Sequence, residues 1–324
     1  MSIKFYVPDY NNDNPKRASF RFRATIPLKG MRPEDGIISH IEEAKQGDLV
    51  ILAKKSKPKD VHYLKERNIK CLYDICDNKW RKNVATNWVQ NVIIPHNEMC
   101  KHADGLVTTC NGMRELIYNN SGRDSFIVND PYEFEKTKPS FNFDNKITIF
   151  NFGNSKHFSR IRWNEVINKF ENAGIDFEIH CMLDRTKKYI EEYQTTEKLY
   201  LHEYDYDKQK EMMRMSDLIF LPVLAQTPEQ FIDLKVKSPN RVIDSIQAGK
   251  PVLTNISVQS WVHFKPYIEF AYPSYDGWTK GLKELLNRKK EQIIAFLEEG
   301  QKYIEENHSP KVIGKQWIEL ENRV

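Results

Sequence analysis

The stretch from Lys237 to Asn255, KSPNRVIDSIQAGKPVLTN, constrains the fold more than any other part of the sequence. Ser238 is suited to cap a helix, and Pro239 fits the first helical position, where its missing N–H costs no hydrogen bond. Gly249 ends this helix, and an apolar run follows after a Lys-Pro pair. The stretch therefore predicts a helix whose N-terminus faces phosphate and which is followed by a buried strand.

The predicted helix has an apolar face and a charged one. At 100° per residue, the apolar residues at positions 242, 243 and 246 share one face, whereas Arg241 and Asp244 lie opposite. The unpaired N–H groups of the first turn, including that of Asn240, lie beside Lys237 and Arg241, a combination suited to a diphosphate. The alternative is a surface ion pair between Arg241 and Asp244, with Lys237 solvated.

This segment resembles a known signature. Asp244–Val252, DSIQAGKPV, is similar to the E-A-x-A-x-G-x-P-V turn of GT-B nucleotide-sugar glycosyltransferases, particularly the family-4-like group of bacterial polysaccharide and glycoconjugate synthesis. Asp244 stands where that family usually has a ribose-binding Glu. Many members carry another Glu eight residues earlier, and Val236 stands there instead. The missing Glu argues against the retaining mechanism of that family more than against its fold.

The length and the order of motifs predict two domains. A chain of 324 residues exceeds the usual size of one hydrophobic core. The polar stretch 131–145 has two prolines and no periodicity, which is typical of a linker. The resemblance implies two Rossmann-like parallel-sheet domains facing a cleft. We expect an acceptor domain over residues 1–135, a donor domain over 146–305 and a final helix, 309–324, that packs back on the first domain.

Strands and helices alternate in the first half. Strands are expected at Ile3–Val7 and Leu49–Ala53, and helices at Ile38–Lys45 and Lys59–Arg67. Such alternation predicts a parallel sheet that is covered on both faces.

Two carboxylates follow the next strand of this half. Asp74 and Asp77, in YDICDNKW, resemble the Y-D-x-D-D-x-x-W segment of a GT-B subgroup. Either could bind acceptor hydroxyls or take a proton from one, or both could simply cap a loop and a helix. Arg21 and Arg23 resemble an S-x-R-x-R start and are predicted to meet the acceptor or donor phosphate; exposed arginines at a helix start are the alternative. His96 is a weaker candidate base.

The second half opens with a strand that ends at a predicted donor loop. Gly153, Asn154 and Lys156 resemble the loop that opens GT-B donor domains, and Arg160 could supply a further cation. Tyr204 is expected near the nucleotide base, with ordinary packing as the alternative. The stretch from 223 to 236 is read as a long loop next to the sugar.

Composition excludes several classes of protein. No apolar run approaches the roughly 20 residues that span a bilayer, and the N-terminus lacks a signal-peptide pattern, so a cytoplasmic protein is expected. Five cysteines without a C-x-x-C pair indicate neither disulfides nor zinc. Four lysines between 54 and 59 predict a solvated turn, or peripheral attraction to the inner membrane face. A basic face with interleaved aromatics is missing, which argues against nucleic acid.

Together, the motifs and the resemblance predict a glycosyltransferase of the EC 2.4 type. It would move a sugar from a UDP- or GDP-sugar to a glycan, lipid-linked or other glycoconjugate acceptor. The catalytic residues would be Asp74, Asp77, Lys237 and Arg241. No cofactor is expected besides the nucleotide-sugar co-substrate, and no metal, because protein cations would stabilise the leaving diphosphate. A non-hydrolysing UDP-sugar epimerase and a catalytically weak sugar-nucleotide-binding protein remain as alternatives.

Overall fold

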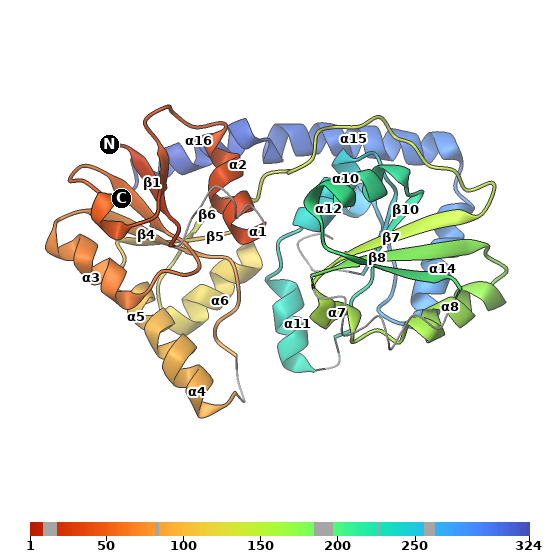
Figure 1. Cartoon of the computed structure of the whole chain (residues 1–324), viewed down its shortest axis with the longest axis horizontal. Helices are drawn as coiled ribbons and strands as arrows, with labels where there is room; N and C mark the ends of the chain where they lie inside the picture. The colour runs from red at the N-terminus through yellow and green to blue at the C-terminus, as the bar shows by residue number, and fades with distance from the viewer. Residues whose placement is uncertain (9–17, 82–83, 185–196, 226, 256–262) are drawn as a thin grey trace. The chain divides into compact units, whose positions relative to one another are not determined.

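The computed structural model describes residues 1–8, 18–81, 84–184, 197–225, 227–255 and 263–324. The chain forms two compact units. Unit 1 comprises Met1–Glu133, Glu229–Asn240 and Glu305–Val324, and unit 2 comprises Phe134–Pro228 and Arg241–Ile304. Each unit contains one parallel sheet with helices, so the predicted α/β class with two parallel sheets is confirmed (Figure 1).

The sheet of unit 1 has the strand order β2-β1-β3-β4-β5-β6, and all its pairs are parallel. Its strands are β1 (Ile3–Tyr6), β2 (Gly36–Ile38), β3 (Leu49–Leu52), β4 (Lys70–Ile75), β5 (Gly105–Thr108) and β6 (Phe126–Ile127). The order changes direction between β1 and β3. The carboxyl ends of strands at such a point are where open α/β sheets bind their ligands.

The helices of unit 1 come from three separate parts of the chain. The first part supplies α1 (Ala18–Phe20), the π-helical turn η1 (Arg21–Thr25), α2 (Ile26–Leu28), η2 (Ile41–Glu43), α3 (Pro58–Glu66), α4 (Thr86–Trp88), the π-helical turn η3 (Val89–Ile93), α5 (Ile94–His102) and α6 (Asn111–Ser121). The second part supplies α11 (Pro228–Lys235), and the third supplies α16 (Pro310–Leu320).

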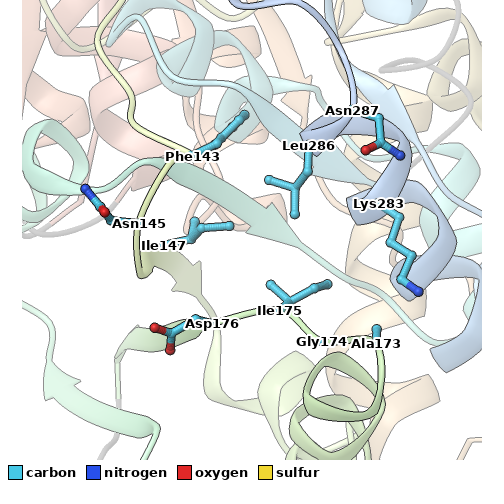
Figure 2. A pocket seen from close by; sticks show the side chains of 10 residues that line it. All are labelled: Phe143, Asn145, Ile147, Ala173, Gly174, Ile175, Asp176, Lys283, Leu286 and Asn287. Carbon is cyan, nitrogen blue, oxygen red and sulfur yellow. The ribbon is translucent and has the colours of Figure 1, made fainter.

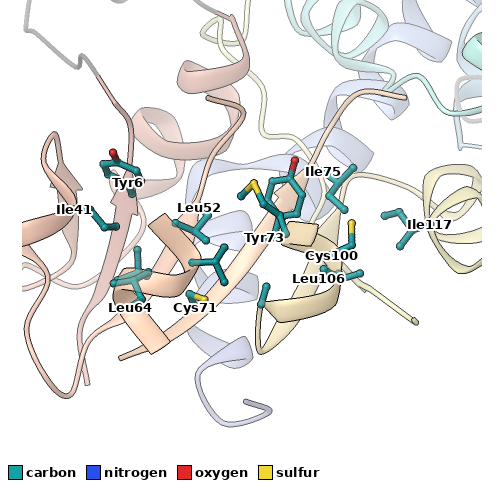
Figure 3. Close-up of a cluster of buried hydrophobic side chains, with 14 of the residues drawn as sticks. Tyr6, Ile41, Leu52, Leu64, Cys71, Tyr73, Ile75, Cys100, Leu106 and Ile117 are labelled. Atoms are coloured by element: carbon teal, nitrogen blue, oxygen red, sulfur yellow. The ribbon is translucent and has the colours of Figure 1, made fainter. Parts of the chain in front are cut away.

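The alternation of side chains along β3 explains why this sheet is covered on both faces. Val50 and Leu52 belong to a core cluster with residues of α3, α5 and α6, which Figure 3 shows in part. Leu49 and Ile51 point the other way and belong to a second cluster with residues of α1 and α16. Successive residues of a strand face opposite sides, so a run of four apolar residues contributes to both cores.

The sheet of unit 2 is also entirely parallel, with the order β12-β11-β10-β7-β8-β9. Its strands are β7 (Ile147–Gly153), β8 (Phe177–Leu183), β9 (Leu199–Glu203), β10 (Leu218–Leu221), β11 (Val252–Thr254) and β12 (Glu269–Phe270). This is the strand order of dinucleotide-binding sheets, and its direction reverses between β7 and β10. The carboxyl ends of those two strands are therefore the place to look for a ligand site.

Aromatic side chains fill the core of unit 2. Phe220 of β10 contacts Trp163, Phe170 and Trp278, with ring centroids 6.4, 5.9 and 5.7 Å away. The helices are α7 (Ser155–Phe158), α8 (Trp163–Asn172), α10 (Tyr206–Met215), α12 (Asn240–Gln247), η4 (Lys265–Tyr267), α14 (Tyr275–Leu286) and α15 (Lys290–His308). Helix α15 begins in unit 2 and ends in unit 1, because the division of the chain falls after Ile304.

Two sequence-based expectations on secondary structure were wrong. The stretch Ile38–Lys45 forms the end of β2 and one 3-10 turn, because Ile38 pairs with Tyr6 in the sheet. The stretch 223–236 contains helix α11 where a loop was expected. Helix α11 lacks buried residues, so its sequence has no regular apolar stripe to indicate a helix.

Candidate functional site

At the carboxyl end of β7, an arginine from α12 packs against the strand end. Arg241 Nη1 donates to the carbonyl oxygen of Phe152 at 3.0 Å. Gly153 has a φ of +150°, and a Cβ placed there would lie 2.7 Å from Arg241 Nη1. Only glycine therefore allows both this backbone conformation and the close approach of the guanidinium. The predicted donor residues Gly153 and Arg241 are brought together at the switch point of the sheet.

Arg241 is a desolvated cation. Burial lowers its pKa to about 10, which still leaves the guanidinium charged at neutral pH. A guanidinium offers several N–H donors in a plane that matches phosphate oxygens. The strand end can therefore bind an oxyanion.

The other predicted residues of the phosphate-facing helix divide between the two units. Asp244 lies on α12 in unit 2 and is 3% exposed. Ser238, Pro239 and Asn240 precede it and belong to unit 1. The helix starts at Asn240, one residue after the predicted start, and the Oγ of Ser238 has no hydrogen-bond partner among the described residues. The helix that the sequence predicts as one binding element is thus shared by two units.

The remaining predicted donor residues lie around the ends of β7, β8 and β9. Asn154 is exposed, and its Nδ2 donates to Asp184 at 3.4 Å. Arg160 is exposed after α7, and half-buried Tyr204 donates its backbone N–H to Leu183 at 2.9 Å. The side chain of Lys156 lies outside the described residues. These positions thus follow the strands at the carboxyl end of the sheet, and their role in a donor loop stays a prediction.

In unit 1, Asp77, two residues after β4, forms a charged group with one lysine that follows β3 and one that follows α11. Lys54, two residues after β3, forms an ion pair with Asp77, and Lys237 lies 4.0 Å away on the other carboxylate oxygen. Burial alone would raise the pKa of Asp77, but Lys54 and Lys237 outweigh burial and lower it. Asp77 is therefore an ionised hydrogen-bond acceptor and a weak base.

Arg23 and Asp74 lie in the interior of unit 1, away from any surface that an acceptor could reach. Both are 3% exposed, and Arg23 binds the Asp74 carboxylate through Nε and Nη2 at 3.0 and 2.8 Å. The Nη1 of Arg23 donates to Val128 O at 2.6 Å and to Asp130 Oδ1 at 3.1 Å. The expected contact of Arg23 with the acceptor is therefore wrong, and so is the catalytic role of Asp74. The two buried charges neutralise each other and face no surface.

Arg21 was also expected at the acceptor. It is 9% exposed and forms a forked ion pair with Glu133 of the same unit. Arg21 is thus paired within unit 1. It is neither at an acceptor, as expected, nor exposed at a helix start, which was the alternative.

Sequence reasoning missed five polar residues near Asp77 as a group. Asn78 Nδ2 and Arg81 Nη2 both donate to Asp233 of α11, at 3.0 and 3.3 Å. Lys79 lies half-buried between them in sequence. The sequence pattern indicated a solvated turn for Lys54, although its place two residues after a buried strand also indicates the ligand-binding edge.

The described cavity does not belong to these sites. It has a volume of about 320 Å³ and lies in unit 2 (Figure 2). Its lining includes Asn145 and Ile147 at the start of β7 and Asp176 just before β8. These positions are at the amino ends of the strands, the edge opposite Gly153. None of the predicted site residues lines it.

Two searches of the described residues complete the site. No group of three or more His, Cys, Asp or Glu side chains in them could hold a metal ion. No helix among them is long and apolar enough to cross a membrane.

Comparison of the whole chain with known proteins gives structural matches. No family model matches the sequence, and no curated protein matches it significantly. The Anabaena protein HepE, solved in complex with UDP-glucose, is similar with a TM-score of 0.71 and 11% identity over 100% of both chains. A trehalose-6-phosphate protein from E. coli, bound with UDP-2-fluoro glucose, matches with a TM-score of 0.69 and 9% identity, over 100% of this chain and 99% of that one.

A glycosyltransferase from Rickettsia africae is similar with a TM-score of 0.63 and 14% identity, over 99% of this chain and 98% of that one. This chain has the GT-B fold. The resemblance that the signature around Asp244 indicated is confirmed at the level of the fold. Gly153 and Arg241 belong to unit 2, and Asp77 belongs to unit 1.

Proposed function

We propose that this protein is a glycosyltransferase that moves a sugar from a nucleotide-sugar donor to a hydroxyl of an acceptor. The donor binds at the carboxyl end of the unit 2 sheet and the acceptor at the carboxyl end of the unit 1 sheet. The similar HepE structure holds UDP-glucose, which supports a UDP-sugar as the donor to test first.

The observation that carries this proposal is the contact of Arg241 with the end of β7. A half-buried guanidinium is held 3.0 Å from the Phe152 carbonyl, and Gly153 leaves no Cβ between the strand end and the cation. Such a cation suits the leaving diphosphate, whose negative charge increases in the transition state. A positioned cation can therefore lower the barrier to transfer.

The reaction needs one bond exchange and one proton transfer. The acceptor oxygen forms a bond to the anomeric carbon of the sugar, the bond from that carbon to the diphosphate breaks, and the hydroxyl proton is released. Asp77, being ionised and a weak base, orients the acceptor hydroxyl by accepting its hydrogen bond. Arg241 takes the place of a metal ion at the diphosphate.

The acceptor is a glycan, a lipid-linked sugar or another glycoconjugate. Lysines 54–59 supply a local positive charge that suits contact with the anionic inner face of a membrane. Such contact would bring the enzyme to a lipid-linked acceptor while leaving it a peripheral protein.

A panel of nucleotide-sugars, incubated with and without acceptor sugars, tests the reaction. Release of nucleotide that depends on an acceptor is the expected result. An epimerised sugar without an acceptor would favour the epimerase, and binding without any turnover would favour a binding protein.

Calorimetric titration of UDP and GDP tests the donor site. Replacing Arg241 with Gln should weaken nucleotide binding by roughly tenfold or more, because a charge-assisted hydrogen bond contributes about 1.5–3 kcal/mol. Asp244→Asn should have a similar effect if Asp244 accepts ribose hydroxyls. The matched control is Arg67→Gln, an arginine of unit 1 that stacks on Tyr63 and should leave affinity unchanged. Equal affinities in wild type and Arg241→Gln would remove Arg241 from the site.

A further inference from the structure

The loop after β4 in unit 1 gathers more cations than carboxylates. Lys54 and Lys237 contact Asp77, and Arg81 contacts Asp233. Lys79 adds a fourth cation between Asp77 and Arg81 in the same loop. Four cations thus face two carboxylates, and the loop has an excess of positive charge.

The loop is fixed to the rest of unit 1 at two places. At one place, Asp77 is held by Lys54 at the end of β3. At the other place, Asp233 of α11 accepts from Asn78 at 3.0 Å and from Arg81 at 3.3 Å. Charged groups that are held in place before a ligand arrives lose little conformational freedom on binding.

Lys79 is a cation of this loop whose charge has no carboxylate in an ion pair with it among the described residues. It is half-buried. Burial lowers its pKa, Asp77 opposes that effect, and the nearby charges of Lys54 and Arg81 add to it. An anion placed here would relieve both the burial and the repulsion, because an opposite charge favours the charged form of a lysine.

An aromatic residue, Trp80, follows this lysine in the sequence. Trp80 packs on His96 with ring centroids 4.3 Å apart, and its Nε1 donates to Asn97 Oδ1 at 2.7 Å. The indole is therefore fixed, and part of it remains accessible to solvent. A rigid aromatic surface beside a cation suits a sugar that carries a charged group.

We propose that Lys79, with Lys54 and Arg81, binds a phosphate or carboxylate group of the acceptor, so that the acceptor is an anionic carbohydrate. This inference rests on the proposed function, since it assigns the acceptor class to the unit 1 site. The position agrees with it: β3 and β4 are neighbours, and their carboxyl ends lie beside the switch point between β1 and β3. Asp77, at the same strand end, then orients the hydroxyl that reacts.

Calorimetric titration of the full chain tests the anion site without any need for turnover. The probes are inorganic phosphate, glucose 6-phosphate, glucuronate and neutral glucose. We expect glucose 6-phosphate or glucuronate to bind at least tenfold more tightly than glucose. Lys79→Gln should weaken binding of the charged probes by roughly tenfold to a hundredfold, the range of a lost charge-assisted hydrogen bond.

Two further variants separate charge from folding. Lys79→Arg keeps the positive charge and should keep the preference for anionic probes. Lys101→Gln removes an exposed lysine from α5 of the same unit and should bind every probe like wild type. If wild type and Lys79→Gln bind phosphate, glucose 6-phosphate and glucuronate equally, the proposal is overturned.

UDP, titrated into the same variants, distinguishes acceptor from donor. We expect Lys79→Gln to bind UDP like wild type. A loss of UDP affinity in Lys79→Gln would assign the cation to the donor diphosphate and overturn the acceptor assignment. If wild type binds the anionic sugars but no nucleotide, the glycosyltransferase proposal fails and the anion site stands.

Discussion

Arg23 shows how a single residue can look functional in the sequence and prove structural in the fold. Its guanidinium bonds to Asp74, Asp130 and the carbonyl of Val128 in the interior of unit 1, and its Cζ lies 5.1 Å from the Trp317 ring centroid. These contacts join the ends of β4 and β6 to helix α16. The guanidinium thus links three parts of the chain that are distant in sequence.

Replacing Arg23 with Met should lower the free energy of unfolding by about 3–5 kcal/mol, because Asp74 and Asp130 would remain buried without their cation. Urea unfolding measures this change. Arg114→Met is the control, since its ion pair with Asp124 is on the surface and its loss should hardly matter. A shift no larger than that of the control would contradict the structural role of Arg23.

His96 illustrates burial of a titratable group. It is 3% exposed, its Nδ1 lies 2.8 Å from the hydroxyl of Tyr73, and its Nε2 has no partner among the described residues. Burial, with a smaller contribution from Lys79, lowers the pKa of His96 to about 3. A buried histidine with so low a pKa binds a proton only weakly, so His96 is a poor candidate for the base that the sequence left open.

This pKa predicts how stability depends on pH. An unfolded histidine titrates near pH 6.5, so below about that pH the unfolded chain binds a proton that folded His96 does not. The free energy of unfolding should therefore fall as pH decreases, by up to about 1.4 kcal/mol per unit, until His96 itself titrates. Urea unfolding at pH 7 and pH 5 measures how much the free energy of unfolding falls between these two values. This fall should be about 2 kcal/mol smaller in His96→Gln than in the wild type. Equal losses would contradict the shift.

At the scale of elements, helix α11 is the least expected component. Its sequence lies between β10 and β11 of unit 2, yet it packs in unit 1. Val236, just after the helix, is 3% exposed in the core of unit 1, and Lys235 forms an ion pair with Glu115 of α6 at 2.7 Å. A Cβ at Gly112, in the first turn of α6, would collide with the carbonyl of Lys235. Glycine at this position thus lets the two helices approach.

Gly112→Ala should separate α6 from the end of α11 and lower the free energy of unfolding by about 1–3 kcal/mol, the usual cost of overpacking. Amide hydrogen exchange should show weaker protection in residues 229–240 than in the wild type. Gly36→Ala is the control, because no atom lies within 4 Å of a Cβ at Gly36. Unchanged exchange in residues 229–240 would contradict the role of this close approach.

At the scale of the whole molecule, the chain passes between its two units four times, after Glu133, Pro228, Asn240 and Ile304. The predicted linker at 131–145 contains the first of these passages. The other three fall near α11, α12 and the end of α15. The cations Lys237 and Arg241 consequently belong to different units although they are four residues apart.

The proposed chemistry uses the guanidinium of Arg241 in place of a metal ion, which predicts full turnover in excess EDTA. Nucleotide release from the donor that works in the panel, measured with and without EDTA, checks this. The matched comparison adds Mg²⁺ or Mn²⁺ to the EDTA-treated protein. Activity that disappears in EDTA and returns with either ion would show that a metal stabilises the diphosphate.

The sequence alone determined the fold class, because apolar runs bounded by Gly, Pro and capping residues are local patterns. The signature at Asp244–Val252 and the restart of the pattern at Ile147 predicted the two sheets and the place of Gly153. Only the tertiary structure decided which charged residues meet. Arg23 and Asp74 are 51 residues apart, and Asn78 and Asp233 are 155 apart. Whether a charge is buried with a partner or left for a ligand depends on such distant pairs, which no local pattern records.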